Sequence, residues 1–325
     1  MLPPFPYIRA ATMKEAVAGI VSEKTHIHAG GTDLLTCLHD HVFETDGLVS
    51  ISRLDKLRGI QKTSDNGLRI GALTTITEVS EHPLVHRMYP GLAQGASEVA
   101  SPQLRNQGTI GGNLCQKPRC WYYRGEFHCL RKGGDTCYAV GGENQFHCIL
   151  GGSGCFIVHP SDTAPPLISL DARVRVQGRN GSQEIKVENL HMPPSEDPTR
   201  ETVLEPGEII TEIILPPPGQ NLRSSYRKVR ARRSWDFALA GLALALWFEG
   251  DRVANGRVVF SGVAPVPWRS QEVEEVIRGK RLDETTIARA AEAAVQNARP
   301  MSGNGYKVSL LKGVIEEELN KMAAA

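Results

Sequence analysis

Six of the seven cysteines in this 325-residue chain fall within 41 residues, and no two of them have C-x-x-C spacing. Structural zinc sites usually use short C-x₂₋₄-C pairs, whereas thiolates spread over a long segment suit an iron–sulfur cluster. The alternative, reduced cysteines packed as small apolar residues, is the weaker interpretation for so dense a group. The clustering predicts a metal centre in an inserted loop at about residues 115–158. The six are Cys115, Cys120, Cys129, Cys137, Cys148 and Cys155.

Two pairs of consecutive glycines, Gly30-Gly31 and Gly111-Gly112, are the second feature that could bind a ligand. Neither pair belongs to a G-x-G-x-x-G fingerprint or to a G-x-x-x-x-G-K-[ST] phosphate loop. Residues without a side chain still let backbone N–H groups approach phosphate oxygens, above all where a helix or turn begins. Thr32, Thr109 and Asn113 add short polar side chains nearby. Alone, such a pair is more often a plain turn, so the surrounding sequence must decide.

Alternating helices and strands surround these loops. Residues 26–35 read as a strand that enters Gly30-Gly31 before a helix begins, and residues 76–100 read as helical with a break at Pro90-Gly91. After the cysteines, alternating valines and a Gly-Arg-Asn-Gly turn predict a hairpin near residues 173–187. Further strand-like runs stand at 48–52, 68–73, 242–248 and 256–263, and helical runs at 13–21, 285–298 and 307–322.

A proline run at the end of residues 205–220 predicts a domain boundary. We therefore expect an α+β protein with a first domain of residues 1–220 and a smaller α+β domain of residues 221–325. The inserted loop belongs to the first domain.

Charge is balanced along the chain. Lys and Arg number 37 against 36 Asp and Glu, so the net charge of +1 provides no overall field for nucleic acid or an anionic membrane. The densest basic stretch, residues 227–233, favours a partner interface or a solvated strand edge. No window resembles a membrane span, and the N-terminus lacks an apolar signal region, so we expect a cytoplasmic protein without membrane or nucleic-acid partners.

Five motifs occur in an order that resembles the FAD-binding subunit of the molybdenum hydroxylases, the family of xanthine dehydrogenase, carbon monoxide dehydrogenase and 4-hydroxybenzoyl-CoA reductase. The resemblance covers essentially the whole chain. It implies a two-subdomain FAD-binding fold of the PCMH/VAO type, followed by a smaller C-terminal domain. The motifs are AGGTDLL (29–35), TIGGNL (109–114), HPSDTAPPLISLDA (159–172), YRKVRARRSWDFALAG (226–241) and FSGVAPVPWR (260–269).

The resemblance also implies where FAD binds. The two glycine loops would hold the pyrophosphate, Asp162 would lie near the flavin and ribitol, Leu204 would pack against the isoalloxazine, and Lys228 would approach the cofactor. The predicted cofactor-binding residues are Ala29, Gly30, Gly31, Thr32, Asp33, Leu34, Thr109, Ile110, Gly111, Gly112, Asn113, Asp162, Leu204 and Lys228.

The inserted loop departs from simple flavin subunits, which run from GGN almost directly into the PSD segment. It resembles the variant in 4-hydroxybenzoyl-CoA reductase (beta subunit) and some bacterial aldehyde oxidoreductases, where this loop carries a 4Fe-4S cluster. The match implies Cys120, Cys129, Cys137 and Cys155 as ligands, with Cys148 as the rival fourth ligand. For the two other cysteines we expect that Cys115 lines the flavin pocket or packs, and that Cys37 belongs to the core.

The implied function is electron transfer by an oxidoreductase subunit with no substrate-transforming residues of its own. FAD and the cluster would pass electrons between a 2Fe-2S small subunit, a molybdenum-cofactor large subunit and an external carrier such as ferredoxin or NAD. Two alternatives stay open: a FAD subunit whose loop binds structural zinc, and a zinc-stapled nucleic-acid-binding module.

Overall fold

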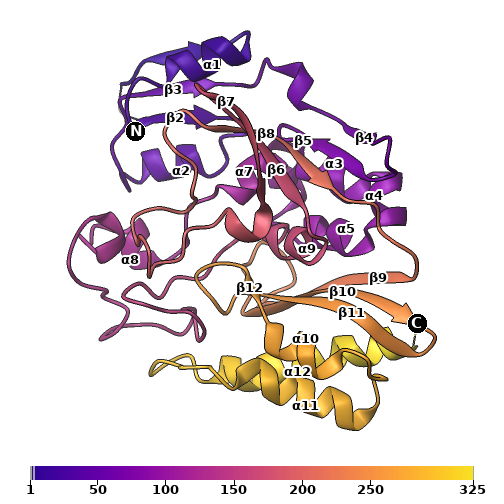
Figure 1. The fold of residues 1–325 in the computed structure, drawn as a ribbon. Coiled ribbons are helices and arrows are strands. Elements are labelled where there is room, and N and C mark those ends of the chain that lie inside the picture. Colours follow the sequence, from indigo (N-terminus) through magenta and orange to yellow (C-terminus); the bar gives the residue numbers. More distant parts are fainter. Residues whose placement is uncertain (1, 3, 325) are drawn as a thin grey trace.

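The computed structural model describes residue 2 and residues 4–324. In this part of the chain the strands form three sheets, flanked by helices (Figure 1). The predicted α+β class is confirmed. No helix among the described residues is long and apolar enough to cross a membrane.

A small parallel sheet in the order β1-β3-β2 forms the N-terminal region. Helix α1 begins after Thr12, whose hydroxyl caps the helix by accepting a hydrogen bond from the Glu15 amide at 3.1 Å. Ala16, Val17 and Ile20 of this segment pack against Val49 of β3. The elements are β1 (Tyr7–Arg9), α1 (Met13–Gly19), β2 (Thr25–His28), α2 (Leu34–His39) and β3 (Gly47–Ser50).

An antiparallel sheet in the order β4-β5-β8-β6-β7 follows. Its central strand β8 comes from beyond the cysteine-rich loop, so the chain leaves the sheet after β5 and returns much later (Figure 1). The predicted hairpin is confirmed as β6 and β7. The strands are β4 (Ile60–Lys62), β5 (Leu68–Gly71), β6 (Arg173–Gly178), β7 (Gly181–Lys186) and β8 (Ile209–Leu215).

Short helices fill the excursion between β5 and β6. Pro90 starts α5, which explains the predicted break in the helical stretch. Thr75 and Thr109 pair as an isolated β-bridge, which fixes the second glycine loop beside the start of α3. The helices are α3 (Ile76–Glu81), α4 (Pro83–Met88), α5 (Pro90–Ser97), α6 (Pro102–Gln107), α7 (Ile110–Leu114), α8 (Trp121–Arg124) and α9 (Ala164–Ser169).

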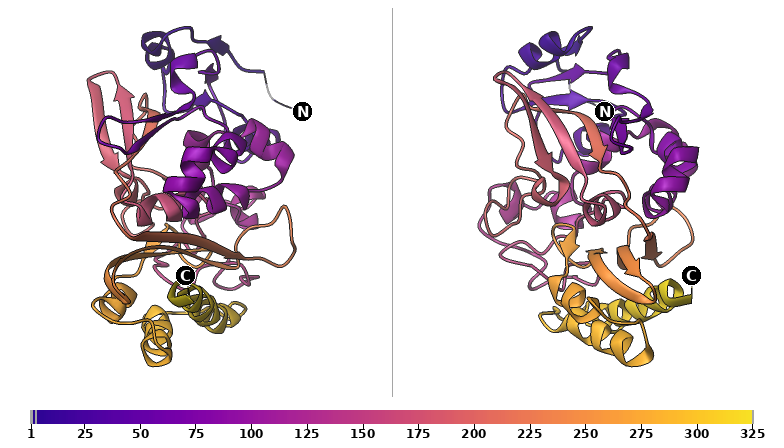
Figure 2. Two further views of the ribbon diagram at one scale, coloured as in Figure 1. Left: turned by 90° about the vertical axis from the view of Figure 1, so that its right-hand side faces the viewer. Right: turned by 45° about the vertical axis from the view of Figure 1, so that its right-hand side comes forward.

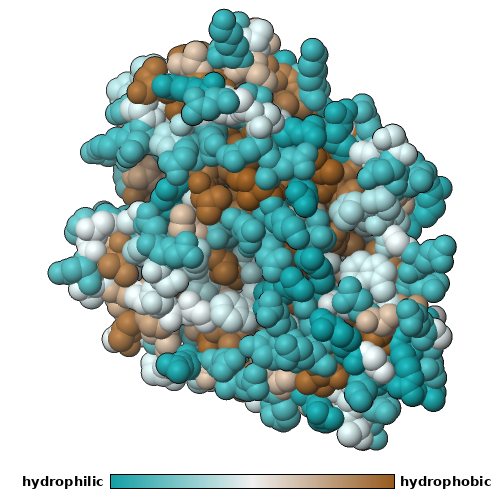
Figure 3. All heavy atoms as spheres, viewed as in Figure 1, coloured by the Kyte–Doolittle hydropathy of each residue, from teal (hydrophilic) through white to brown (hydrophobic). Residues whose placement is uncertain are grey.

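The inserted loop lies between α7 and α9 and holds little regular structure apart from α8 and the 3-10 turn η2 (Leu130–Lys132). Aromatic rings pack against one another within it, including Trp121 against Phe146 and Tyr122 against Phe127. Several of these side chains stay partly exposed, and the surface in Figure 3 shows apolar residues scattered among hydrophilic ones.

The C-terminal region contains a sheet in the order β12-β11-β10-β9 with a helix layer on one side (Figure 2). Along β10, Leu242, Leu244 and Leu246 pack with the helices, whereas Ala243 and Ala245 face the core of the preceding region. The small alanines let α9 approach the sheet closely. The elements are β9 (Leu222–Val229), β10 (Ala240–Glu249), β11 (Arg252–Ser261), β12 (Trp268–Arg269), α10 (Gln271–Ile277), α11 (Glu284–Val295) and α12 (Tyr306–Ala324).

Candidate functional site

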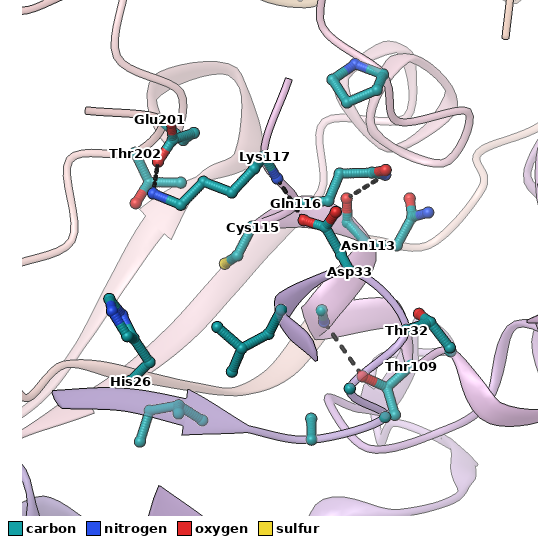
Figure 4. A pocket seen from close by; sticks show the side chains of 18 of the residues that line it. His26, Thr32, Asp33, Thr109, Asn113, Cys115, Gln116, Lys117, Glu201 and Thr202 are labelled. Atoms are coloured by element: carbon teal, nitrogen blue, oxygen red, sulfur yellow. Dashed lines mark hydrogen bonds and ion pairs between the residues drawn. The ribbon is translucent and has the colours of Figure 1, made fainter. Parts of the chain in front are cut away.

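A cavity of about 1050 Å³ lies between the N-terminal sheet, the α6–α7 turn, the start of the inserted loop and the segment 197–208. This volume is at the upper end of the range of roughly 300–1,000 Å³ that is usual for cofactor sites. Of the fourteen residues expected to bind FAD, twelve line this cavity, and Ile110 and Gly111 do not. Figure 4 shows Thr32 and Asp33 from one glycine loop and Thr109 and Asn113 from the other.

The first glycine loop connects β2 to α2 and requires glycine at both positions. A Cβ on Gly30 would lie 2.2 Å from the backbone oxygen of Gln107, and Gly31 has a φ of +74°. The amide of Leu35 donates to the Gly31 oxygen at 3.0 Å, which starts α2. The preceding amides of the first turn have no partner within the helix, so this loop can present N–H groups to an anion.

The second glycine loop differs from the expectation of free backbone donors. The amides of Ile110 and Gly111 donate to the oxygens of Thr74 and Ala72, and that of Gly112 donates to the Thr109 hydroxyl oxygen. Ile110 is buried in the core, and a Cβ on Gly111 would lie 2.9 Å from the Ala72 Cβ, so both residues serve packing. Side chains rather than amides of this loop are left for a ligand.

Asn113 is the best-positioned of these side chains. Its Oδ1 accepts hydrogen bonds from the hydroxyls of Ser161 at 2.6 Å and Thr163 at 2.7 Å. Because both donors act on the oxygen, the amide orientation is fixed and the Nδ2 hydrogens stay available. The motif PSDT therefore orients a donor of the motif TIGGN at the cavity wall.

Asp162 and Lys228 form a buried ion pair at the same wall, with 2.8 Å between Oδ2 and Nζ. The Asp162 Oδ1 accepts a hydrogen bond from the Tyr226 hydroxyl at 2.7 Å. Burial raises the pKa of Asp162, and the Lys228 charge opposes this rise. Asp162 and Lys228 both line the larger cavity, as expected, and Tyr226 and Lys228 of strand β9 hold the Asp162 carboxylate in place.

Several residues that line the larger cavity are not among the cofactor-binding residues predicted from the sequence. Arg119 pairs with Asp33 at 2.6 Å, and Lys117 pairs with Glu201 (Figure 4). The buried Nε of Arg119 and Nε2 of His26 have no hydrogen-bond partner among the described residues. Trp235 and Phe237 also line the cavity, directly after the basic stretch 227–233 that was expected to be an interface or a strand edge. The only sequence signal for Lys117 and Arg119 was their position directly after TIGGNLCQ, whereas Trp235 and Phe237 lie within the motif of residues 226–241.

A second, smaller cavity lies inside the inserted loop. Cys120, Cys129, Cys137 and Cys155 all line it, but Cys148 does not. Among the described residues, no three His, Cys, Asp or Glu side chains come close enough to hold a single metal ion. The four thiols thus surround a space instead of converging on one point.

The walls of this second cavity are buried or half-buried apart from the exposed Tyr138, and they carry two buried nitrogen-bearing side chains, His147 and Arg131. The Nε2 of His147 lies 3.3 Å from the Cys120 Sγ. Burial raises the pKa of the Cys120 thiol to about 11 and also raises that of Cys155, where Arg131 opposes the rise. Nearby cations or a metal are therefore needed to hold thiolates here.

The other two cysteines lie elsewhere. Cys115 lines the larger cavity, as one of the two expectations had it. Cys37 is fully buried and packs with Tyr123 and Cys129.

Sequence comparison identifies the family. The FAD binding domain in molybdopterin dehydrogenase matches residues 3–218, and the CO dehydrogenase flavoprotein C-terminal domain matches residues 224–321. The chain is 35% identical over 303 residues to the aldehyde oxidoreductase FAD-binding subunit PaoB of Escherichia coli strain K12, which covers 91% of each chain. The chain belongs to the FAD-binding subunits of the molybdenum hydroxylases. This flavoprotein subunit is also 26% identical over 328 residues to the carbon monoxide dehydrogenase medium chain of Hydrogenophaga pseudoflava, covering 98% of each.

Solved structures share the fold of this flavoprotein subunit. A carbon monoxide dehydrogenase from Hydrogenophaga pseudoflava matches with a TM-score of 0.78 and 25% identity, covering 98% of this chain and 97% of the other. A reconstituted CO dehydrogenase from Oligotropha carboxidovorans matches with a TM-score of 0.80 and 21% identity, covering 100% and 99%. The expected oxidoreductase family and two-part flavin fold are confirmed.

Proposed function

We propose that this flavoprotein subunit binds FAD in the larger cavity and a 4Fe-4S cluster in the smaller one, and that it passes electrons between partner subunits and an external carrier. The observation that carries the proposal is the separation of the expected residues into two cavities. Twelve expected flavin-binding residues line the first, and the four expected thiol ligands line the second.

The larger cavity fits the FAD group chemically. The Gly30-Gly31 turn offers amides at the start of α2, Thr109 and Asn113 offer side-chain donors, and the unpartnered nitrogens of Arg119 and His26 offer two more. A pyrophosphate is bound by several such N–H donors. Lys117 and Arg119 are each paired with an acid, so the donors named here supply the contacts without adding unpaired charge. Leu204 contributes an apolar surface to the lining.

The arrangement of the four thiols suits a cluster better than a single ion. A cluster of several iron and sulfide atoms spans more space than zinc, and its ligands stand apart from one another around it. The four thiols surround the cavity without forming a group able to hold one ion. Cys148 does not line this cavity. Its absence from the lining favours the ligand set Cys120, Cys129, Cys137 and Cys155 over a set that uses Cys148 as the fourth ligand.

When bound, FAD converts between two-electron and one-electron transfer. The residues of this chain would hold the two groups apart in fixed positions: Asp162 and Lys228 as a charge-balanced wall, and the inserted loop as the ligand frame. The partners that we propose are a 2Fe-2S small subunit and a molybdenum-cofactor large subunit. Ferredoxin, NAD or another external carrier would complete the path.

We also propose the division into residues 1–220 and 221–325, supported by the gap between β8, which ends at Leu215, and β9, which begins at Leu222. A cytoplasmic location stays a prediction that cell fractionation would test.

The ligand set is tested by comparing Cys129→Ser with Cys148→Ser. Loss of one thiolate from the proposed set should remove most iron and sulfide and the broad visible absorption from Cys129→Ser, because the cluster is held by its thiolates. Cys148→Ser should keep wild-type iron. Both variants should retain most FAD, since neither residue lines the larger cavity. Equal iron in wild type and Cys129→Ser, or zinc in place of iron in the wild type, would refute the cluster.

A further inference from the structure

Arg131 is a buried cation in the wall of the four-thiol cavity. Its side chain is 2% exposed, and it follows the proposed ligand Cys129 by two positions in η2. The Nη1 atom donates to the Pro198 oxygen at 2.8 Å, and Nη2 donates to the Arg200 oxygen at 2.9 Å. The guanidinium is therefore held in one position by the segment 197–201.

One donor of this guanidinium is unused. The buried Nε of Arg131 has no hydrogen-bond partner among the described residues. An unpaired N–H of a buried charged group is costly, so its retention beside four thiols points to a ligand in that cavity.

Glu201 pairs with the same guanidinium. Its Oε1 accepts from Arg131 Nη2 at 2.8 Å, and its Oε2 pairs with Lys117. Glu201 and Lys117 line the larger cavity, whereas Arg131 lines the smaller one. The Arg131–Glu201 pair is thus a shared wall between the two cavities, and its net field at the thiols depends on both charges.

We propose that Arg131 sets the reduction potential of the cluster, with Glu201 partly offsetting its charge. The inference rests on the proposed function, because it requires a cluster between the four thiols. Net charge near a cluster and hydrogen bonds to its sulfurs shift its reduction potential. A buried cation stabilises the reduced, more negative state, and in a site of low polarity this effect is poorly screened. Arg131 acts by holding a positive charge in a fixed position beside the thiols, and it does not itself accept or donate electrons.

The experiment is a potentiometric titration of the intact assembly, following the cluster by electron paramagnetic resonance. Arg131→Met should disfavour reduction at least tenfold at a fixed potential, which corresponds to a midpoint about 59 mV more negative for one electron. Glu201→Gln should shift the midpoint in the opposite direction, since it leaves Arg131 without its counter-charge. Arg131→Lys keeps the charge and should stay nearer to wild type than Arg131→Met.

Lys132→Met is the matched control, because it removes the neighbouring cation, which does not line the cavity and donates to the Gly125 oxygen. It should leave the midpoint close to wild type. If Arg131→Met loses its iron, its midpoint cannot be measured. A Glu201→Gln midpoint more positive than that of the wild type then supports the inference, and a midpoint that is unchanged or more negative overturns it. Wild-type midpoints in every variant that carries iron, or equal shifts in Lys132→Met and Arg131→Met, would overturn the inference. Absence of iron from the wild-type assembly would instead overturn the proposed function.

Discussion

Two imidazole rings pack edge to face in the core, one from His159 of the HPSD motif and the other from His191. The ring centroids of His159 and His191 lie 4.2 Å apart, and both side chains are buried. His191 Nε2 lies 3.1 Å from the Leu114 oxygen, while the His191 Nδ1 and the His159 Nε2 have no partner in the described part of the chain. Burial lowers the pKa of His191 to about 4 and lowers that of His159 well below its usual range.

This pair makes folding sensitive to mild acid. Below pH 6.5 the unfolded chain takes up a proton at His191, but the folded protein does not until about pH 4, so stability is lost as the pH falls through this window. Between pH 8 and pH 5, the free energy of unfolding of the wild type should therefore fall by about 2 kcal/mol more than that of His191→Gln. Urea unfolding at both pH values measures the difference. The exposed His39→Gln is the control, and an unchanged pH dependence in His191→Gln would contradict the assignment.

Gly112 shows how a single missing side chain keeps a site open. It lines the larger cavity, and an added Cβ there would meet only the Thr109 hydroxyl oxygen, at 3.0 Å. Gly112→Leu should fill the space that the cofactor needs, so we expect at least a tenfold drop in the FAD retained after purification. Gly313→Leu on the exposed side of α12 tests for a general effect of leucine. Full flavin occupancy in Gly112→Leu would remove this loop from the proposed site.

At the scale of elements, Asp33 joins the first turn of α2 to the inserted loop. Its Oδ1 accepts from Arg124 at 2.8 Å and pairs with Arg119, and its Oδ2 accepts from the Lys117 amide at 2.7 Å. Burial opposes ionisation, but Arg119 and Arg124 outweigh it and lower the pKa of Asp33. The carboxylate is therefore charged at neutral pH, and the link is lost only in acid, as the pH falls through the lowered pKa of Asp33.

Removing this link should disturb both cavities together. Asp33→Asn leaves two partly buried guanidinium groups without a counter-charge, at a cost on the order of 2 kcal/mol. We expect FAD and iron to fall in the same preparation, because one carboxylate holds the flavin loop and the start of the inserted loop. Asp40→Asn, at the other end of α2, is the exposed control. Wild-type FAD together with wild-type iron in Asp33→Asn would disprove the coupling.

The elements that could be predicted from the sequence are those whose signal is local. The Gly30-Gly31 turn, the hairpin β6–β7 and the helices α11 and α12 carry their own turn residues or periodicity, and each is present in the structure. Strand β4 was missed because its three residues, Ile60–Lys62, are too few to show alternation. Periodicity also failed in the inserted loop, where clustered cysteines were the only guide.

Side-chain partners across long separations were out of reach. Arg131 and Glu201 are 70 residues apart in the sequence, Asp33 and Arg124 are 91 apart, and no local pattern records contacts over such separations. The sequence likewise could not show that the amides of Ile110 and Gly111 are consumed by Thr74 and Ala72. Motif resemblance located the loops, and packing decided which atoms of each loop remain free.

At the scale of the whole molecule, side chains of the C-terminal region hold the end of the inserted loop through hydrogen bonds. Asn304, between α11 and α12, is fully buried, and its Nδ2 donates to the oxygens of His147 and Cys148 at 3.1 and 3.0 Å. Lys307 donates to the Phe146 oxygen at 3.0 Å from the first turn of α12. Residues on opposite sides of the proposed domain boundary thus form one wall of the loop that holds the thiols.

The Asn304 hydrogen bonds predict that a substitution in the C-terminal region lowers the cluster content of the inserted loop. Asn304→Ala leaves the His147 and Cys148 oxygens and the Met301 amide without their partner, at a cost on the order of 3 kcal/mol. Because none of these residues lines the larger cavity, we expect lower iron and sulfide content with near-normal FAD. Ser302→Ala removes one partly buried hydrogen bond from Asn144 and should change neither cofactor. Parallel loss of FAD and iron in Asn304→Ala would mean that the C-terminal region supports the whole fold, whereas selective loss of iron would make it a specific support of the thiol cavity.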